Sequence, residues 1–249
     1  QKLENLPNSL QSLTLGYSFN KKLENLPNSL QSLTLGSKFN QKLENLPEGL
    51  QKLILYYNDQ KIDNLPTGLR SLKLYNYNQK LENLPTGLRS LKLYHYNQKL
   101  ENLPTGLRSL KLYNYNQKLE NLPNSLRNLT LGYNFNKKLE NLPNSLRKLS
   151  LGYHFNQKLE NLPNSLQILK LGGKFNKNLN ACLAFPKLQI LKIGINYKGN
   201  IPIIFDTTII FLDDQFFSAC EKKIKNQVEQ NYDFNEWKNI FYKSIKDML

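Results

Sequence analysis

Side chains able to carry catalysis are sparse in this sequence, and none of them stands in a catalytic or metal-binding arrangement. The chain has two histidines, His95 and His154, and two cysteines, Cys182 and Cys220. A zinc site or a catalytic triad needs such groups in combination, and no suitable set occurs here. The glutamates repeat in one environment, so nothing separates two of them into an acid and a base. We therefore predict a protein without catalytic activity, cofactor, metal or small-molecule substrate.

The residues with the clearest binding chemistry are basic and aromatic. Of the formal net charge of +15, +13 belongs to residues 1–176, which hold 24 basic and 11 acidic side chains. No acidic residue lies within any Leu-x-x-Leu-x-Leu segment, where lysines, arginines and tyrosines recur in rows. Tyrosine and arginine are typical anchors of protein interfaces. The predicted partner-binding residues are Lys52, Tyr56, Arg70, Lys73, Tyr75, Arg89, Lys92, Tyr94, Arg108, Lys111 and Tyr113.

These rows favour a protein partner with an acidic surface, but two other interpretations stay open. The same basic face permits binding of a nucleic acid or another polyanion, although no known nucleic-acid-binding fold accompanies it. The rows also arise if the units were simply copied, with no partner at all. A second basic row, beginning at Lys2, is offset by an acidic row beginning at Glu4. We interpret that pair of rows as a solvated rim.

The elements that must position these side chains are short internal repeats. Proline recurs every 19 or 20 residues and defines nine units. The first unit reads QKLENLPNSLQSLTLGYSFN, and its companions are nearly identical. Such a period is the signature of a solenoid, in which each unit stacks on the next. The units are 1–20, 21–40, 41–59, 60–78, 79–97, 98–116, 117–136, 137–156 and 157–176.

Within each unit the apolar spacing predicts one short strand and an extended return. Leu13 and Leu15 alternate with polar residues, so both point to the same side of a strand. Stacking the units at about 4.8 Å then builds a parallel sheet lined by leucine on its inner face. The remaining residues are too few for a helical crossover, and Pro7 favours extended backbone. We therefore predict strands on a concave face and an extended, polyproline-like convex side.

Two further rows are predicted to have structural roles. Phenylalanine or tyrosine, as at Phe19 and Tyr77, recurs after the strand in eight of the nine units and should stack as a buried aromatic spine. Asparagine closes nearly every unit, with Asp59 once in its place. We expect these amides to be buried and to satisfy backbone groups of the turns. The predicted ladder comprises Asn20, Asn40, Asn78, Asn97, Asn116, Asn136, Asn156 and Asn176.

The phrase LP-x-S-L-x-x-L-x-L-G-x-x-FN resembles the FNIP repeat, a relative of the leucine-rich repeat (LRR) found in social amoebae and in giant viruses of amoebae. The resemblance covers residues 1–176, although the central units lack the glycine and one residue. It implies an LRR-like solenoid. Viral members often carry an F-box, which implies a substrate receptor for a cullin-type ubiquitin ligase; no F-box is visible here. The repeat is also similar to that of secreted bacterial effectors, but the FN ending favours the FNIP family.

The C-terminal part of the chain is predicted to close the solenoid. Residues 188–193 repeat the strand pattern, and residues 201–212 form an apolar stretch suited to a last strand. Helical spacing follows in residues 217–228 and 234–248, and we expect these helices to cap the sheet. A partner-binding helical hairpin is the alternative. The predicted domains are therefore repeats at 1–176, an irregular unit and strand at 177–213, and a helical cap at 214–249.

The sequence also indicates where the protein functions. It contains no apolar run of about 18 residues that would span a membrane. Two cysteines provide no disulfide framework of the kind that secreted proteins use. Because the chain opens with Gln1 inside a repeat phrase, we expect a further segment upstream. These features favour an intracellular protein of the cytoplasm, or of the host cytoplasm if it is viral.

Overall fold

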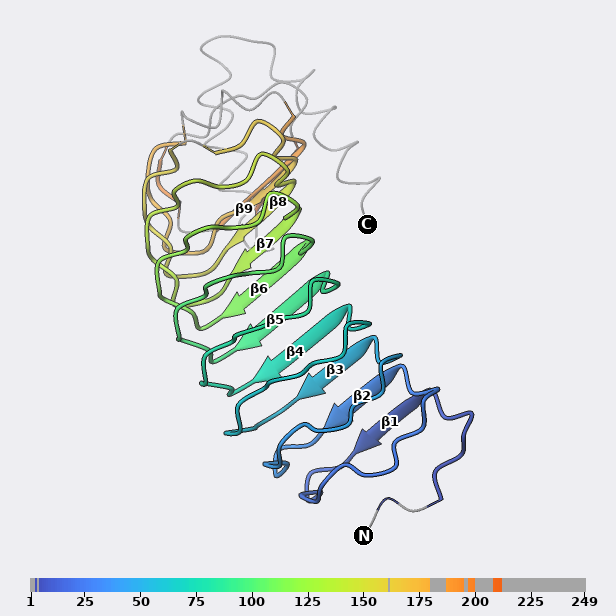
Figure 1. Cartoon of the computed structure of the whole chain (residues 1–249). Coiled ribbons are helices and arrows are strands. Elements are labelled where there is room, and N and C mark those ends of the chain that lie inside the picture. The colour runs from blue at the N-terminus through green and yellow to red at the C-terminus, as the bar shows by residue number, and fades with distance from the viewer. Residues whose placement is uncertain are drawn as a thin grey trace, which may run out of the picture.

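The computed structural model describes residues 3, 5–160, 162–179, 187–194, 197–199 and 208–211. Over these residues the chain forms one eleven-stranded sheet, in which each strand pairs with its neighbours in chain order. The units stack in a single column with the strands along one side (Figure 1). The strands are β1 Ser12–Leu15, β2 Ser32–Leu35, β3 Lys52–Leu55, β4 Ser71–Tyr75, β5 Ser90–Tyr94, β6 Ser109–Tyr113, β7 Asn128–Leu131, β8 Lys148–Leu151, β9 Ile168–Lys170, β10 Ile190–Ile193 and β11 Thr208–Phe211.

The inner face of the sheet is a continuous row of leucines. All strand pairs are parallel, and equivalent residues lie directly opposite each other, as Leu72, Leu91 and Leu110 do in β4, β5 and β6. These three side chains are fully buried. Because a strand alternates its side chains, burying the leucines turns the residues between them outward. The predicted parallel sheet with an inner leucine row is confirmed.

A tight turn precedes every strand of the nine units. The leucine N–H donates to the carbonyl of the proline three residues earlier, at 3.0 Å, in all nine. Asn-Ser, Thr-Gly or Glu-Gly fills the middle of this turn, and these are residues that turns favour. The described residues contain no helix, as expected for such short returns. Each return segment therefore includes this turn just before its strand.

A ladder of left-handed backbone positions also shapes the return. The asparagine before each Leu-Pro pair has a φ between 51° and 58° in eight units. Only glycine adopts this region freely, and asparagine is among the few other residues that tolerate it. Apolar periodicity carries no sign of such a bend, so sequence reasoning missed it. The residues are Asn5, Asn25, Asn45, Asn64, Asn83, Asn102, Asn121 and Asn141.

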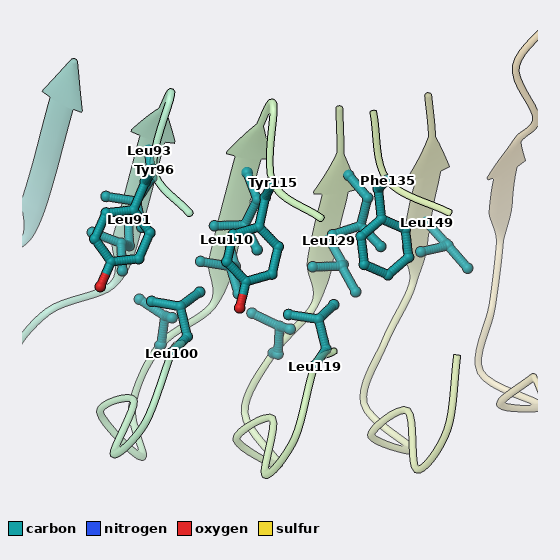
Figure 2. Close-up of a cluster of buried hydrophobic side chains, with 14 of the residues drawn as sticks. Leu91, Leu93, Tyr96, Leu100, Leu110, Tyr115, Leu119, Leu129, Phe135 and Leu149 are labelled. Carbon is teal, nitrogen blue, oxygen red and sulfur yellow. The ribbon is translucent and has the colours of Figure 1, made fainter. Parts of the chain in front are cut away.

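The predicted aromatic spine runs through the interior behind the sheet. The rings of Phe135, Phe155 and Phe175 are buried and stack in parallel, with centroids 6.2 Å apart at each step. Tyr197 of the tenth unit continues this stack at 6.1 Å. Figure 2 shows the rings beside the strand leucines, with leucines of the return segments below them. The spine thus joins the sheet to the returns as one hydrophobic core.

Tyrosine takes the spine position in three units that are one residue shorter than the phenylalanine units. The Tyr77 hydroxyl accepts a hydrogen bond from the Ile62 N–H at 3.1 Å. The Tyr96 hydroxyl accepts one from the Leu81 N–H at 3.3 Å. The Tyr115 hydroxyl is buried near the equivalent Leu100 amide, but no hydrogen bond of normal geometry forms. These hydroxyls therefore lie against the backbone of the return segment.

Asn58 interrupts the spine in the third unit. It occupies the aromatic position and is only 1% exposed. Its amide donates to the Gln41 carbonyl at 3.1 Å, and its side-chain oxygen accepts from the Gln60 N–H. A buried amide is tolerated when both of its ends are hydrogen-bonded. The spine therefore contains one polar link between Phe39 and Tyr77.

Beyond the nine units the sheet continues. Strand β10 pairs with β9, and β11 pairs with β10 in the same parallel register. Both strands fall within segments that the sequence predicts as a tenth unit and a last strand. The predicted helices at 217–228 and 234–248, as well as Cys182 and Cys220, lie outside the described residues.

Candidate functional site: the basic, tyrosine-bearing sheet face

The outward face of the sheet carries three rows of side chains. The middle row changes from threonine in the first two strands to Ile54, and then to Lys73, Lys92 and Lys111. Lys52 does not belong to this row. It pairs with Ser71 in the preceding row of the same outward face. Sequence spacing alone treats both outward positions of a strand alike, and the register separates them.

The third row is a stack of four tyrosines. The rings of Tyr56 and Tyr75 have centroids 4.7 Å apart, and Tyr75, Tyr94 and Tyr113 follow at 4.2 Å each. Planes of neighbouring rings differ by at most 18°. This spacing follows from the strand separation of about 4.8 Å. Each inner ring therefore has a neighbour on both of its faces and exposes only its edge and its hydroxyl.

The lysine row lies directly beside this tyrosine stack. The Lys73 ammonium is 4.8 Å from the Tyr75 ring centroid and 5.4 Å from that of Tyr94. Partial burial lowers the pKa of the Lys92 ammonium, and the charges of Lys111, Lys73 and Lys52 lower it further. Burial, together with the neighbouring Tyr113 and Tyr75, raises the pKa of Tyr94. We define the basic–tyrosine face as Lys73, Lys92, Lys111, Tyr56, Tyr75, Tyr94 and Tyr113.

The arginines that precede these strands have a different place. Arg70 donates to the Gly87 carbonyl of the next unit, and Arg89 donates to the Gly106 carbonyl, both at 3.0 Å. A Cβ on Gly87 or Gly106 would fall on that guanidinium. Arg108 faces a unit with Ser125 at the glycine position, and the Ser125 hydroxyl donates instead to the Leu107 carbonyl. Arg70 and Arg89 thus tie adjacent units together, a role that the prediction of a partner contact overlooked.

The acidic side chains lie on the convex rim, where lysines pair with them. Lys61 is 3.0 Å from Glu82 of the next unit. Lys99 pairs with Glu101 and Glu120 in the same way. Interaction with Lys61 lowers the pKa of Glu82, and interaction with Glu82 raises the pKa of Lys61. Among the described residues, the lysine–carboxylate ion pairs all lie on this rim, and none involves the basic–tyrosine face.

The asparagines that close the units are exposed or half-buried, so the prediction that they are buried is wrong. Several of them bridge adjacent units at the surface. The Asn20 side-chain oxygen accepts from the Asn40 N–H at 2.8 Å, and that of Asn136 accepts from the Asn156 N–H at 2.9 Å. Bonds of this kind also run from the units of Asn97, Asn116, Asn156 and Asn176 to the next unit. Asn78 differs, because its oxygen accepts from the Gln98 side chain at 3.4 Å.

Sequence reasoning missed a second aromatic cluster beyond the basic–tyrosine face. Tyr133 and Tyr153 are 54% and 39% exposed, and their rings stack at 5.2 Å. His154 lies edge-on to both rings, and the Lys174 ammonium is 5.5 Å from the Tyr153 centroid. The sequence does contain a sign of this cluster, because the pair Gly-Tyr follows two consecutive strands, at 132–133 and 152–153. In these units glycine occupies the position of the tyrosine row, and the tyrosine follows one residue later.

The part of the chain that the structure describes holds no group of three or more His, Cys, Asp or Glu side chains that could bind a metal ion. Within the same residues, no helix is long and apolar enough to cross a membrane.

A stack of near-identical units with in-register parallel strands defines a solenoid of the LRR type. Within this class, the FNIP Repeat family model matches residues 1–38, 39–76, 57–95, 75–114 and 115–154. The chain therefore belongs to the FNIP repeat family. It is the kind of repeat module that typically binds proteins and is generally non-catalytic.

The chain is also similar to solved structures. The crystal structure of CroV588, described as a novel circular LRR protein, is 34% identical with a TM-score of 0.69. The match covers 84% of this chain but only 38% of that one. YopM from Yersinia enterocolitica is 21% identical over 84% of this chain and 61% of its own, with a TM-score of 0.48. No curated protein is similar enough to match.

Proposed function

We propose that this chain is a protein-binding module whose partner site is the basic–tyrosine face. The observation that supports this most strongly is the combination of four stacked tyrosines with three parallel lysines, none of which takes part in the ion pairs of the described residues. On the rim of the described repeats, by contrast, Lys61, Lys99 and Lys118 are paired with carboxylates. Like charges at adjacent rungs repel each other, and an acidic partner would relieve that repulsion.

The proposed site is narrower than the set predicted from the sequence. Arg70 and Arg89 are occupied by carbonyls of the next unit, and Lys52 stands in another row. Arg108 precedes β6, and the next unit has Ser125 rather than glycine at the equivalent position, so Arg108 has no glycine carbonyl of this kind. The tyrosine edges, the tyrosine hydroxyls and the three ammonium groups remain as donors. Such a surface favours a partner rich in carboxylate oxygens.

Charge reversal tests this proposal. Lys73→Glu, Lys92→Glu and Lys111→Glu together should abolish partner capture from a cell extract while circular dichroism stays unchanged. A matched control reverses Lys80, Lys138 and Lys158, three exposed rim lysines, and alters the net charge by the same amount. Capture should survive in this control. If the sheet-face variant captures the same proteins as the parent chain, the basic–tyrosine face is not the partner site.

Within the family resemblance, the partner would be a substrate for ubiquitin ligation. We propose that, if an F-box is joined to these repeats in a longer chain, the basic–tyrosine face selects the substrate of a cullin-type ligase. The support for this step is the resemblance to F-box proteins with FNIP repeats. Reconstituted ubiquitination of a captured partner checks it, and the sheet-face charge-reversal variant should lose that activity.

A further inference from the structure

The basic–tyrosine face has sharp ends along the solenoid. The tyrosine row stops at Gly36 on one side and Gly132 on the other. A Cβ on Gly36 would lie 2.9 Å from the Tyr17 nitrogen, and one on Gly132 would lie 2.7 Å from the Tyr113 Cα. The backbone therefore leaves no room for a side chain at either limit. The three ring separations give the tyrosine row a length of roughly 13 Å.

This length limits the segment that the face can hold. An extended chain advances about 3.4 Å per residue, so four or five residues cover the row. The three lysines stand on consecutive rungs about 4.8 Å apart. Carboxylates at alternate positions of an extended peptide are about 6.8 Å apart on one side, and two of them fit within the lysine row.

The closed ring faces decide between classes of anionic partner. Single-stranded nucleic acids are commonly bound by stacking bases on exposed aromatic faces. Here Tyr75 and Tyr94 have a ring on both sides at 4.2 to 4.7 Å, which leaves no gap for a base. Ring edges carry positive potential, and the hydroxyls donate hydrogen bonds. The face therefore offers positive edges and donors to an oxygen-rich chain.

Building on the proposed function, we infer that the partner segment is a short, extended acidic peptide. It has about four or five residues with acidic side chains at alternate positions, and it lies across strands β3 to β6 along the solenoid axis. Its carboxylates contact Lys73, Lys92 and Lys111. Its backbone carbonyls accept hydrogen bonds from the tyrosine hydroxyls.

Fluorescence polarisation with the full chain tests this inference. The first probe is a labelled peptide of five residues with two glutamates at alternate positions among serines. The second has the same composition, but its two glutamates are three residues apart, which turns them to opposite sides of an extended chain. The third is a labelled thymidine oligonucleotide with two phosphates. We expect the alternating peptide to bind at least about tenfold more tightly than either other probe.

Substitutions locate that binding. Lys92→Thr, which installs the residue of the outer units, should weaken the alternating peptide about tenfold, whereas Lys138→Thr on the rim should leave it unchanged. Equal binding of the two peptides, tighter binding of the oligonucleotide, or no binding of any probe would each overturn the inference. In any of these cases, loss of extract capture in the sheet-face charge-reversal variant still supports the proposed function.

Discussion

At the scale of single residues, the spine shows how one hydroxyl changes the role of a buried ring. Phenylalanine units bury the ring alone, whereas Tyr77 and Tyr96 add a hydrogen bond to a return-segment amide. Tyr115 is fully buried without such a bond. Burial raises the pKa of Tyr96 and of Tyr115 to about 12. Two equally placed tyrosines therefore differ in what their hydroxyls contribute.

Tyr115→Phe and Tyr96→Phe should separate these contributions in urea unfolding. Near pH 8, Tyr96→Phe should lose about 1 kcal/mol because the Leu81 N–H loses its acceptor, and Tyr115→Phe should be near neutral. Because the pKa of Tyr115 is raised from 10.0 to about 12 in the folded state, the hydroxyl ionises first in the unfolded chain. The free energy of unfolding of the parent chain therefore falls as the pH rises from 10 to 12. Near pH 11, Tyr115→Phe should therefore exceed the parent chain by about 1 kcal/mol. Equal stability of parent and Tyr115→Phe at both pH values would contradict this account.

The sequence predicts buried residues better than backbone bends. The spine positions follow from apolar spacing, because large aromatic side chains avoid water wherever the fold allows it. The closing asparagines were expected to be buried, yet their oxygens serve the next unit while the residues stay at the surface. The left-handed asparagines such as Asn83 were missed, because φ leaves no mark on hydropathy. The hydrophobicity of a side chain predicts whether it is buried. The backbone geometry of a turn depends also on the adjacent units, which the sequence of one unit does not show.

At the scale of the elements, two different junctions hold neighbouring units together. Central units use an arginine that donates to a glycine carbonyl, as Arg89 does to Gly106. Outer units use a serine hydroxyl that donates to a leucine carbonyl, as Ser145 does to Leu126 at 2.7 Å. The two devices exclude each other, because a side chain at Gly106 would meet the Arg89 guanidinium.

A double-mutant cycle tests this exclusion. Gly106→Ser alone should destabilise the chain by about 1–3 kcal/mol through overpacking. In the Arg89→Ala background the same change should cost less than about 1 kcal/mol, because the next nearest atom is the Thr86 carbonyl oxygen, at 3.3 Å. Gly49→Ser is the matched control, since its Cβ would meet only the Asn28 carbonyl at 3.2 Å. An identical penalty at Gly106 in both backgrounds would refute the coupling.

The same junctions give Arg70 and Arg89 a structural role that the sequence did not predict. Sequence reasoning found arginine next to the strands and read it as an interface residue. It could not see that a carbonyl 17 residues further along the chain takes up the guanidinium. The lysine and tyrosine rows fared better, because strand alternation alone places them outward. The strand register places Lys52 opposite Ser71, in the row before the lysine row.

At the scale of the whole molecule, the charges are sorted by surface. Three rim lysines, Lys61, Lys99 and Lys118, form ion pairs with a glutamate of the next unit, whereas the lysines of the basic–tyrosine face adjoin one another. The solenoid keeps the two sets apart, since every unit places them on different segments. The described fold thus holds Lys73, Lys92 and Lys111 in one row, separate from the ion pairs of the rim.

Lys92→Thr should measure the repulsion within this face. At low salt the variant should be more stable than the parent chain by a few tenths of a kcal/mol, because like charges on adjacent strands destabilise a sheet. Screening at about 1 M salt, where the Debye length is about 3 Å, should remove most of that difference. Thermal unfolding at both salt concentrations provides the measurement, with Lys80→Thr on the rim as the control. A gain that persists at high salt would point to packing rather than charge.

The in-register junctions have a consequence for how such a gene changes. Units 79–97 and 98–116 differ at a single position, His95 against Asn114. Each unit has a glycine (Gly87 or Gly106) where it meets the preceding unit and an arginine (Arg89 or Arg108) where it meets the following one. Unequal recombination between them would therefore insert or delete one whole unit and keep an arginine–glycine junction. Each such event would lengthen or shorten the tyrosine and lysine rows by one rung, about 4.8 Å. Copy number would then set the length of peptide recognised, and one recombination step could produce a new specificity.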